Sequence, residues 1–108
     1  MSIVLSGKSQ QYIIKNNIQY ILVDLIITEE SCTKIFEPII KILQKEDLGS
    51  YKELENISDG DLKLYISKNF IKTFGITDIF QIDKSGILKI KLVLSNVEPI
   101  IINTCKTN

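Results

Sequence analysis

Apolar residues near the start of the chain fall in three short runs that predict β-strands. Residues 2–6, 12–14 and 18–28 are rich in isoleucine, valine and tyrosine, which favour extended structure. Asn16 and Asn17 separate the second and third runs, and asparagine tolerates the positive φ angles of a two-residue hairpin turn. Both faces of the third run are largely apolar, so we expect this strand to be central in its sheet. In this register the core-facing residues are Tyr12, Ile14, Ile21, Val23, Leu25 and Ile27.

The pattern changes to helical spacing between Ser31 and Lys45. An apolar stripe there predicts a helix that begins near Thr28 or Ser31, kinks at Pro38 and ends before Gly49. The stripe consists of Cys32, Ile35, Phe36, Ile39, Ile40 and Leu43.

A second helix is predicted after a connector over residues 46–60, which has little periodicity. Asp59 or Asp61 can cap its start, and Gly75 stands where a left-handed residue ends a helix. Lys68 and Lys72 lie on its polar side. Its apolar side consists of Leu62, Tyr65, Ile66, Phe70 and Phe74.

The last third of the chain alternates with a period of two and predicts a hairpin and a final strand. Phe80 and Ile82 share a face with Leu88, Ile90, Leu92 and Leu94 when Asp83 lies opposite Ile87. This register leaves a three-residue loop in which Gly86 has positive φ. The last strand covers residues 100–104, after Pro99.

These elements predict one α+β domain over residues 1–108. The expected order is β-β-β-α-α-β-β-β, with a mainly antiparallel sheet and two helices packed on one face. At 108 residues, with 44% of them hydrophobic, the chain is long enough for one core.

Composition restricts the chemistry that the chain can perform. It has no histidine, its 13 basic residues are all lysine, and 13 acidic residues bring the net charge to zero. Without histidine or arginine it lacks the usual general base and the side chain that binds phosphate in a bidentate way. We therefore expect no enzyme activity, no cofactor and no metal site.

The two cysteines and the start of the chain bear on location. Cys32 and Cys105 have no metal-ligand or Cys-x-x-Cys spacing, so both are expected to be free thiols packed as small apolar residues. Residues 1–8 lack the features of a signal peptide, and no apolar run approaches the roughly 20 residues of a membrane span. We expect a cytoplasmic protein with no membrane partner.

Two local patterns resemble functional sites but do not match them. Gly7-Lys8-Ser9 is like the end of a phosphate-binding loop, but Ser2 stands where its first glycine belongs and a strand is expected to follow. Asp24 lies in an apolar strand, where we interpret it as hydrogen-bonded, for example to Ser9, or as exposed.

Carboxylates are concentrated in the connector, where Lys52 is the one lysine between Glu46 and Asp61. The segment is either a solvated loop or a docking surface for a basic protein. The leading hypothesis is a non-catalytic protein-binding domain, a small inhibitor of a basic enzyme such as a toxin or nuclease, of the immunity, antitoxin or anti-defence type. The candidate partner-binding residues are Glu46, Asp47, Glu53, Glu55, Asp59 and Asp61.

Other functions stay open from the sequence. The alternative is a winged-helix-like nucleic-acid-binding module, with Lys63, Lys68 and Lys72 on its helix and Gly86 in its wing. Zero net charge and the lack of arginine weigh against nucleic acid. A homodimer through the apolar residues 100–102 and a small-ligand pocket between sheet and helices are further alternatives.

Overall fold

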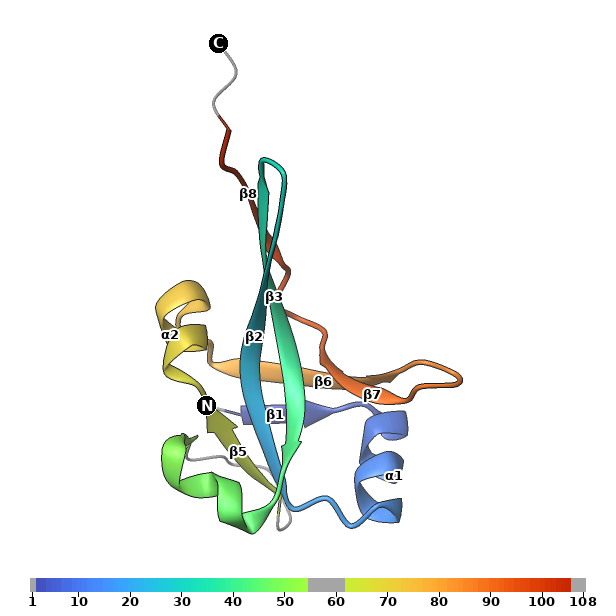
Figure 1. Cartoon of the computed structure of the whole chain (residues 1–108). Coiled ribbons are helices and arrows are strands. Elements are labelled where there is room, and N and C mark those ends of the chain that lie inside the picture. The colour runs from blue at the N-terminus through green and yellow to red at the C-terminus, as the bar shows by residue number, and fades with distance from the viewer. Residues whose placement is uncertain (1, 55–61, 106–108) are drawn as a thin grey trace.

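The computed structural model describes residues 2–54 and 62–105, which form an α+β protein with two mixed sheets (Figure 1). One sheet has the strand order β1-β6-β7 and the other the order β4-β5-β2-β3-β8. The strands are β1 (Ser2–Leu5), β2 (Tyr20–Glu30), β3 (Thr33–Leu43), β4 (Lys52–Leu54), β5 (Lys63–Ile66), β6 (Ile79–Ser85), β7 (Lys91–Leu94) and β8 (Ile100–Asn103). The helices are α1 (Gly7–Lys15), α2 (Lys68–Phe74) and the 3₁₀ helix η1 (Lys45–Ser50).

The second expected strand is instead the helix α1, and the hairpin at Asn16 and Asn17 does not form. The Ser6 side chain accepts a hydrogen bond from the backbone N–H of Ser9 at 3.1 Å, which caps the helix. Asn17 does have positive φ, at 51°, but it follows the end of a helix. In the helix Ile13 is buried and Ile14 is exposed, the reverse of the predicted faces. The N-terminal cap therefore outweighs a strand preference that only three residues supported.

The central position predicted for the third strand is confirmed. β2 lies between β5, with which it is parallel, and β3, with which it is antiparallel. Ile21, Leu22 and Val23 have no exposed surface, so both faces of β2 are covered at this level.

The helix predicted between Ser31 and Lys45 is wrong, because these residues form β3 in a long hairpin with β2. Ser31, with φ of 48°, lies in the turn. The isoleucine-rich sequence of β3 favours a strand, and a proline inside a helix would break it. Pro38 lies opposite Leu25, beyond the stretch of β3 that β8 covers, where a missing N–H is tolerated.

The second predicted helix is divided between β5 and α2. Leu64, Tyr65 and Ile66 are buried in β5, because the parallel pairing with β2 places them in the sheet. Ser67 caps α2 by accepting from the N–H of Phe70 at 3.0 Å. Gly75 ends α2 with φ of 78°, as predicted. The predicted caps Asp59 and Asp61 lie outside the described residues.

The β6–β7 hairpin forms with a longer turn than predicted. Asp83 lies opposite Val93 rather than Ile87. The register is shifted by an even number of residues, so the same side chains keep facing the core. Phe80 and Ile82 still share the core with Leu92 and Leu94, whereas Leu88 and Ile90 are exposed. Gly86 has φ of 98°, which confirms its predicted positive φ.

The core lies between the two sheets and the helices. α1 packs against β1 and β6, α2 against β2, and β7 lies beside β3, so the helices do not share one face of a single sheet as predicted. The main core consists of Ile3, Ile13, Ile18, Ile21, Val23, Leu62, Leu64, Ile66, Phe70, Phe80, Ile82, Leu92 and Leu94. In the described part of the chain, no helix has the length and apolar character needed to cross a membrane.

A three-stranded arm extends beyond the core. The arm consists of residues 25–38 of the β2–β3 hairpin and residues 100–103 of β8, and it gives the molecule its longest dimension, 54 Å against 31 and 26 Å (Figure 1). A disulfide joins Cys32 in the hairpin turn to Cys105 after β8, so the prediction of two free thiols is wrong. The antiparallel register of β8 on β3 brings together two residues that are 73 positions apart.

Candidate functional site

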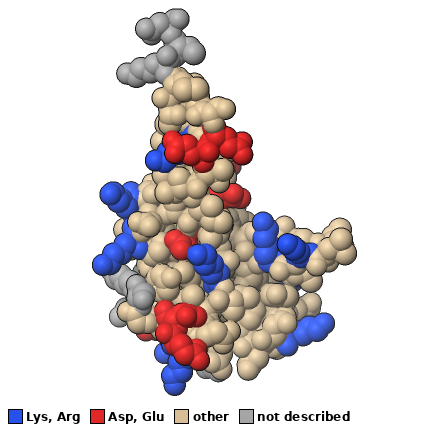
Figure 2. All heavy atoms as spheres, in the orientation of Figure 1, with Lys and Arg blue, Asp and Glu red and all other residues tan. Residues whose placement is uncertain are grey.

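The acidic connector is only partly within the described residues. Glu46 and Asp47 lie in η1 and Glu53 in β4, and all three are exposed. Glu55, Asp59 and Asp61 lie outside the described residues. Figure 2 shows separate acidic groups, one on the arm and one toward the opposite end, with lysines between them.

Two of the described acidic residues, Glu53 and Asp47, interact with neighbouring groups. The Lys63 Nζ is 3.8 Å from the Glu53 carboxylate, and both side chains are more than half exposed. Asp47 accepts a hydrogen bond from the backbone N–H of Gln44 at 3.2 Å. Glu53 lies opposite Tyr65 in the register, and burial, with a smaller effect of this carboxylate, raises the pKa of the Tyr65 hydroxyl.

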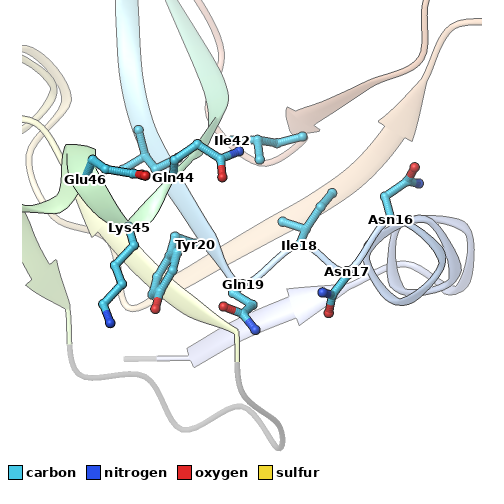
Figure 3. Close-up of a pocket in the computed structure, with 10 residues that line it drawn as sticks. Asn16, Asn17, Ile18, Gln19, Tyr20, Ile42, Gln44, Lys45 and Glu46 are labelled. Carbon is cyan, nitrogen blue, oxygen red and sulfur yellow. The ribbon is translucent and has the colours of Figure 1, made fainter.

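A polar hollow of about 280 Å³ lies beside η1 (Figure 3). In this view the amides of Asn16, Asn17 and Gln19 point in different directions rather than toward one centre. Tyr20, Lys45 and Glu46 are its ionisable lining residues. The lining offers amides for hydrogen bonding and no paired nucleophile and base.

The segment Gly7-Lys8-Ser9 follows β1 and opens α1, contrary to the strand expected there. The arrangement is not a phosphate loop, because Ser6 alone separates the strand from the helix. The buried Ser9 hydroxyl donates to the carbonyls of Ser6 and Ile82, at 2.9 and 3.0 Å. Ser6 in turn donates to the Asp83 carboxylate at 2.6 Å. This bond, with the N–H of Lys84, holds the pKa of Asp83 below its usual value.

The Asp24 carboxylate has two described partners, a lysine and a backbone N–H. Its carboxylate lies 3.5 Å from the Lys41 Nζ and accepts a hydrogen bond from the N–H of Leu25. The predicted contact with Ser9 does not form, because Ser9 is bonded within the α1 and β6 region.

Two further expectations concern metals and nucleic acid. Across residues 2–54 and 62–105, no three cysteine, aspartate or glutamate side chains gather in a group that could hold a metal ion. Lys63 lies in β5 while Lys68 and Lys72 lie in α2, so the three lysines do not share one helix as the winged-helix alternative required.

The arm carries the largest accumulation of exposed apolar side chains among the described residues. Ile27, Phe36 and Ile100 form one row across its three strands, and Thr28, Ile35 and Ile101 form the next row on the opposite face. The exposed aliphatic side chains are Ile26 (48%), Ile27 (51%), Ile100 (36%), Ile101 (68%) and Ile102 (45%).

One face of the arm continues into a groove beside α2. The groove has a volume of about 440 Å³. Its apolar lining comes from the arm and its polar lining from α2. The lining residues are Ile27, Phe36, Asn69, Lys72, Thr73, Ile100 and Ile102. The Lys34 Nζ lies 5.4 Å from the centroid of the Phe36 ring, and Glu29 lies opposite Lys34 in the strand register, so charges of both signs lie near the groove.

The outer edge of β8 is open. β8 is the last strand of its sheet, and within the described chain only β3 pairs with it. Strand residues 100–102 are all isoleucine, with none of the charges or prolines that usually protect such an edge.

Comparison of the chain with protein-family models, with curated proteins and with solved structures finds no match. The candidate site therefore depends on the geometry alone. The sequence indicates the apolar residues 100–102 as a dimerisation alternative. It does not indicate the arm as a whole, because its spacing predicts a helix where β3 forms.

Proposed function

We propose that this protein is a non-catalytic protein-binding domain that docks its partner on the arm. The observation that carries this proposal is the exposed isoleucine surface on the groove face of the arm, where Ile27, Ile100 and Ile102 are 51%, 36% and 45% exposed. Ile26 and Ile101 are exposed on the opposite face. Monomeric proteins seldom leave a contiguous apolar patch on a projecting element unless it forms an interface.

The open edge of β8 indicates how a partner binds. An extended segment of the partner adds to β8 as a further strand, and backbone hydrogen bonds supply affinity. Side chains alternate across that segment, so one set enters the groove lined by Ile27, Phe36 and Ile100. Specificity then depends on what fills the groove.

We further propose that the partner is a basic enzyme, which this protein inhibits in the manner of an immunity protein or antitoxin. Glu29 and Glu30 are exposed at the end of β2, beside the apolar surface of the arm. Glu46, Asp47 and Glu53 form a second exposed acidic surface. Acidic groups beside an apolar surface favour a basic partner, because opposite charges accelerate encounter and exclude other proteins.

The cytoplasmic location also stays a proposal. The Cys32–Cys105 disulfide weighs against it, because disulfides persist mainly in oxidising compartments. Cell fractionation combined with thiol labelling of the intact protein tests it. Free thiols in a cytoplasmic fraction support the proposal, and a fully blocked pair in an oxidising compartment overturns it.

The experiment starts from a photoreactive amino acid at position 101, which captures whatever touches β8. The captured protein is then purified and its affinity measured directly. We expect Ile102→Asp to weaken binding by about tenfold or more, since a charge would enter the apolar groove that Ile102 lines. Ile14→Asp is the matched control, because Ile14 is 71% exposed on α1, outside the arm.

Three results would count against the proposal. An unchanged dissociation constant for Ile102→Asp would exclude the groove face of the arm as the docking surface. Cross-linking to a second copy alone would assign β8 to a homodimer. A captured enzyme whose activity does not fall on binding would exclude inhibition while leaving protein binding intact.

A further inference from the structure

The turn between β6 and β7 exposes two aliphatic side chains to solvent. Ile87 is 94% exposed and Leu88 is 99% exposed, more than any aliphatic residue of the arm. Neither contributes to the core, so the fold gains no hydrophobic stabilisation from them. Burial of these two side chains in another apolar phase would be favourable, because it would remove their apolar surface from water.

The turn is closed and positions these residues at its apex. Gly86 has φ of 98°, and a Cβ atom there would lie 1.8 Å from the carbonyl oxygen of Lys89. This close approach requires glycine and brings the two ends of the turn together. Ile87 and Leu88 lie between those ends, and their exposure shows that they face away from the hairpin.

The same hairpin is basic. Residues 84–97 include Lys84, Lys89 and Lys91 and no acidic residue. The Lys84 Nζ lies 6.0 Å from the centroid of the Tyr12 ring, so α1 holds that charge close to the base of the hairpin. Figure 2 shows lysines and uncharged atoms at the end of the molecule where the hairpin projects, with no acidic atoms visible there.

α1 extends this basic character. Lys8 and Lys15 are exposed on the helix, which packs against β6. The nearest carboxylate on the hairpin strand, Asp83, accepts hydrogen bonds from Ser6 and from the N–H of Lys84. Around the apolar tip, the lysines of the hairpin and of α1 therefore outnumber this one carboxylate.

We propose that this hairpin docks on an anionic phospholipid surface. Ile87 and Leu88 enter the interface between headgroups and acyl chains, while Lys84, Lys89 and Lys91 contact the anionic headgroups. A short apolar insertion and a few lysines are each weak, but together they bind a membrane reversibly. The lack of a spanning helix concerns crossing the bilayer and has no bearing on docking at its surface.

The shape of the tip favours lipid over a protein partner. A stable protein interface needs about 800 Å² on each side, which two side chains on a convex turn do not supply. A lipid interface deforms around such a tip and needs no complementary pocket. The hairpin and the arm also extend in different directions from the core, so docking leaves the arm accessible (Figure 1).

Vesicle flotation with the full chain tests the proposal. Vesicles of phosphatidylcholine alone are compared with vesicles that also contain phosphatidylserine, each at low and high salt. We expect binding to the anionic vesicles that weakens with salt, and little binding to the neutral ones. Failure of the wild-type protein to float with anionic vesicles at low salt would overturn the proposal.

Two paired variants separate the apolar and the basic contributions. We expect Ile87→Asp with Leu88→Asp, and Lys89→Glu with Lys91→Glu, each to lower the partition coefficient by about tenfold or more. Ile101→Asp on the arm and Lys45→Glu in η1 are the matched controls and should bind as the wild type does. Each variant is checked for an unchanged melting temperature, since all these side chains are exposed.

The outcomes distinguish lipid from protein. Equal loss in the hairpin variants and in the controls would show nonspecific adsorption and overturn the proposal. Binding of an acidic protein through Ile87 and Leu88, with no vesicle binding, would also overturn it and assign the tip to a protein partner.

Discussion

The Sγ atom of Cys32 is bonded to that of Cys105, which ties the turn of the β2–β3 hairpin to the chain that leaves β8. The N–H of Thr104 donates to the carbonyl of Cys32 at the same point. Of the described strands, β3 alone pairs with β8, and the side chains of β8 are exposed. The pairing with β3 and the cross-link are therefore the two described restraints on the position of β8.

Replacing both cysteines, Cys32→Ser with Cys105→Ser, should release β8 from the arm. We expect the free energy of unfolding to fall by about 4 kcal/mol, because the cross-link closes a long loop in the unfolded chain. Amide hydrogen exchange at residues 100–103 should accelerate more than in β2. Urea unfolding and hydrogen exchange measure the two effects. Unchanged exchange in β8 would show that strand pairing alone holds it.

Gly86→Ala should destabilise the protein, whereas Gly49→Ala should not. Alanine at position 86 would require positive φ and would clash with the Lys89 carbonyl, while a Cβ at Gly49 meets no atom within 4 Å. We expect a loss of about 1–3 kcal/mol at Gly86. Denaturant unfolding of the two variants makes the comparison, and equal stabilities would contradict the turn geometry.

Ser6→Ala should make stability less sensitive to acid. The pKa of Asp83 is lowered in the folded state, chiefly because the Ser6 hydroxyl donates to its carboxylate. That stabilisation is complete above the unfolded-state pKa, about 4, and is lost as pH falls through the lower folded-state pKa.

Ser67→Ala is the matched control for Ser6→Ala. Both serines cap helices, so each variant should lose about 1 kcal/mol of capping stabilisation at neutral pH. Ser6→Ala should lose, in addition, the stabilisation of the ionised Asp83 carboxylate. Only Ser6→Ala should also flatten the decline of stability below about pH 4, as followed by urea unfolding at a series of pH values. Parallel pH profiles for the two variants would contradict the role of Ser6 at Asp83.

Glu46→Lys with Glu53→Lys should slow association with a basic partner and weaken its salt dependence. The melting temperature should hardly change, because these carboxylates are exposed and the Glu53–Lys63 pair is worth about 0–1 kcal/mol. Association kinetics at low and high salt test this, with Lys45→Glu as the opposite change. Wild-type rates in both variants would show that the acidic surface is only solvated.

The parts of the fold that could be predicted from the sequence are those where residue composition and hydrophobic periodicity indicate the same structure. The central strand β2, the buried pair Phe80 and Ile82, and the positive φ of Gly75 and Gly86 are all confirmed. In each case one physical requirement, burial on both faces or a left-handed backbone, admitted few alternatives.

Other elements could not be predicted because competing patterns matched equally well. The isoleucines of β3 satisfy both a helical stripe and an alternating strand, and only pairing with β2 and β8 decides between them. The disulfide could not be predicted for the same reason, since Cys32 and Cys105 come together only when β8 pairs with β3. The exposed arm could be predicted from neither composition nor charge, because it depends on how far β2 extends beyond the core.

β2 runs without interruption from the fully buried Ile21 to the exposed Glu30 at the end of the arm. No flexible linker separates the arm from the core, so the two share a single orientation. A partner held on the arm loses its rotational freedom relative to the rest of the molecule. If the hairpin apex rests on a bilayer at the same time, the angle between the captured protein and the membrane normal is set by the twist of β2 and by the packing of β3 against β7.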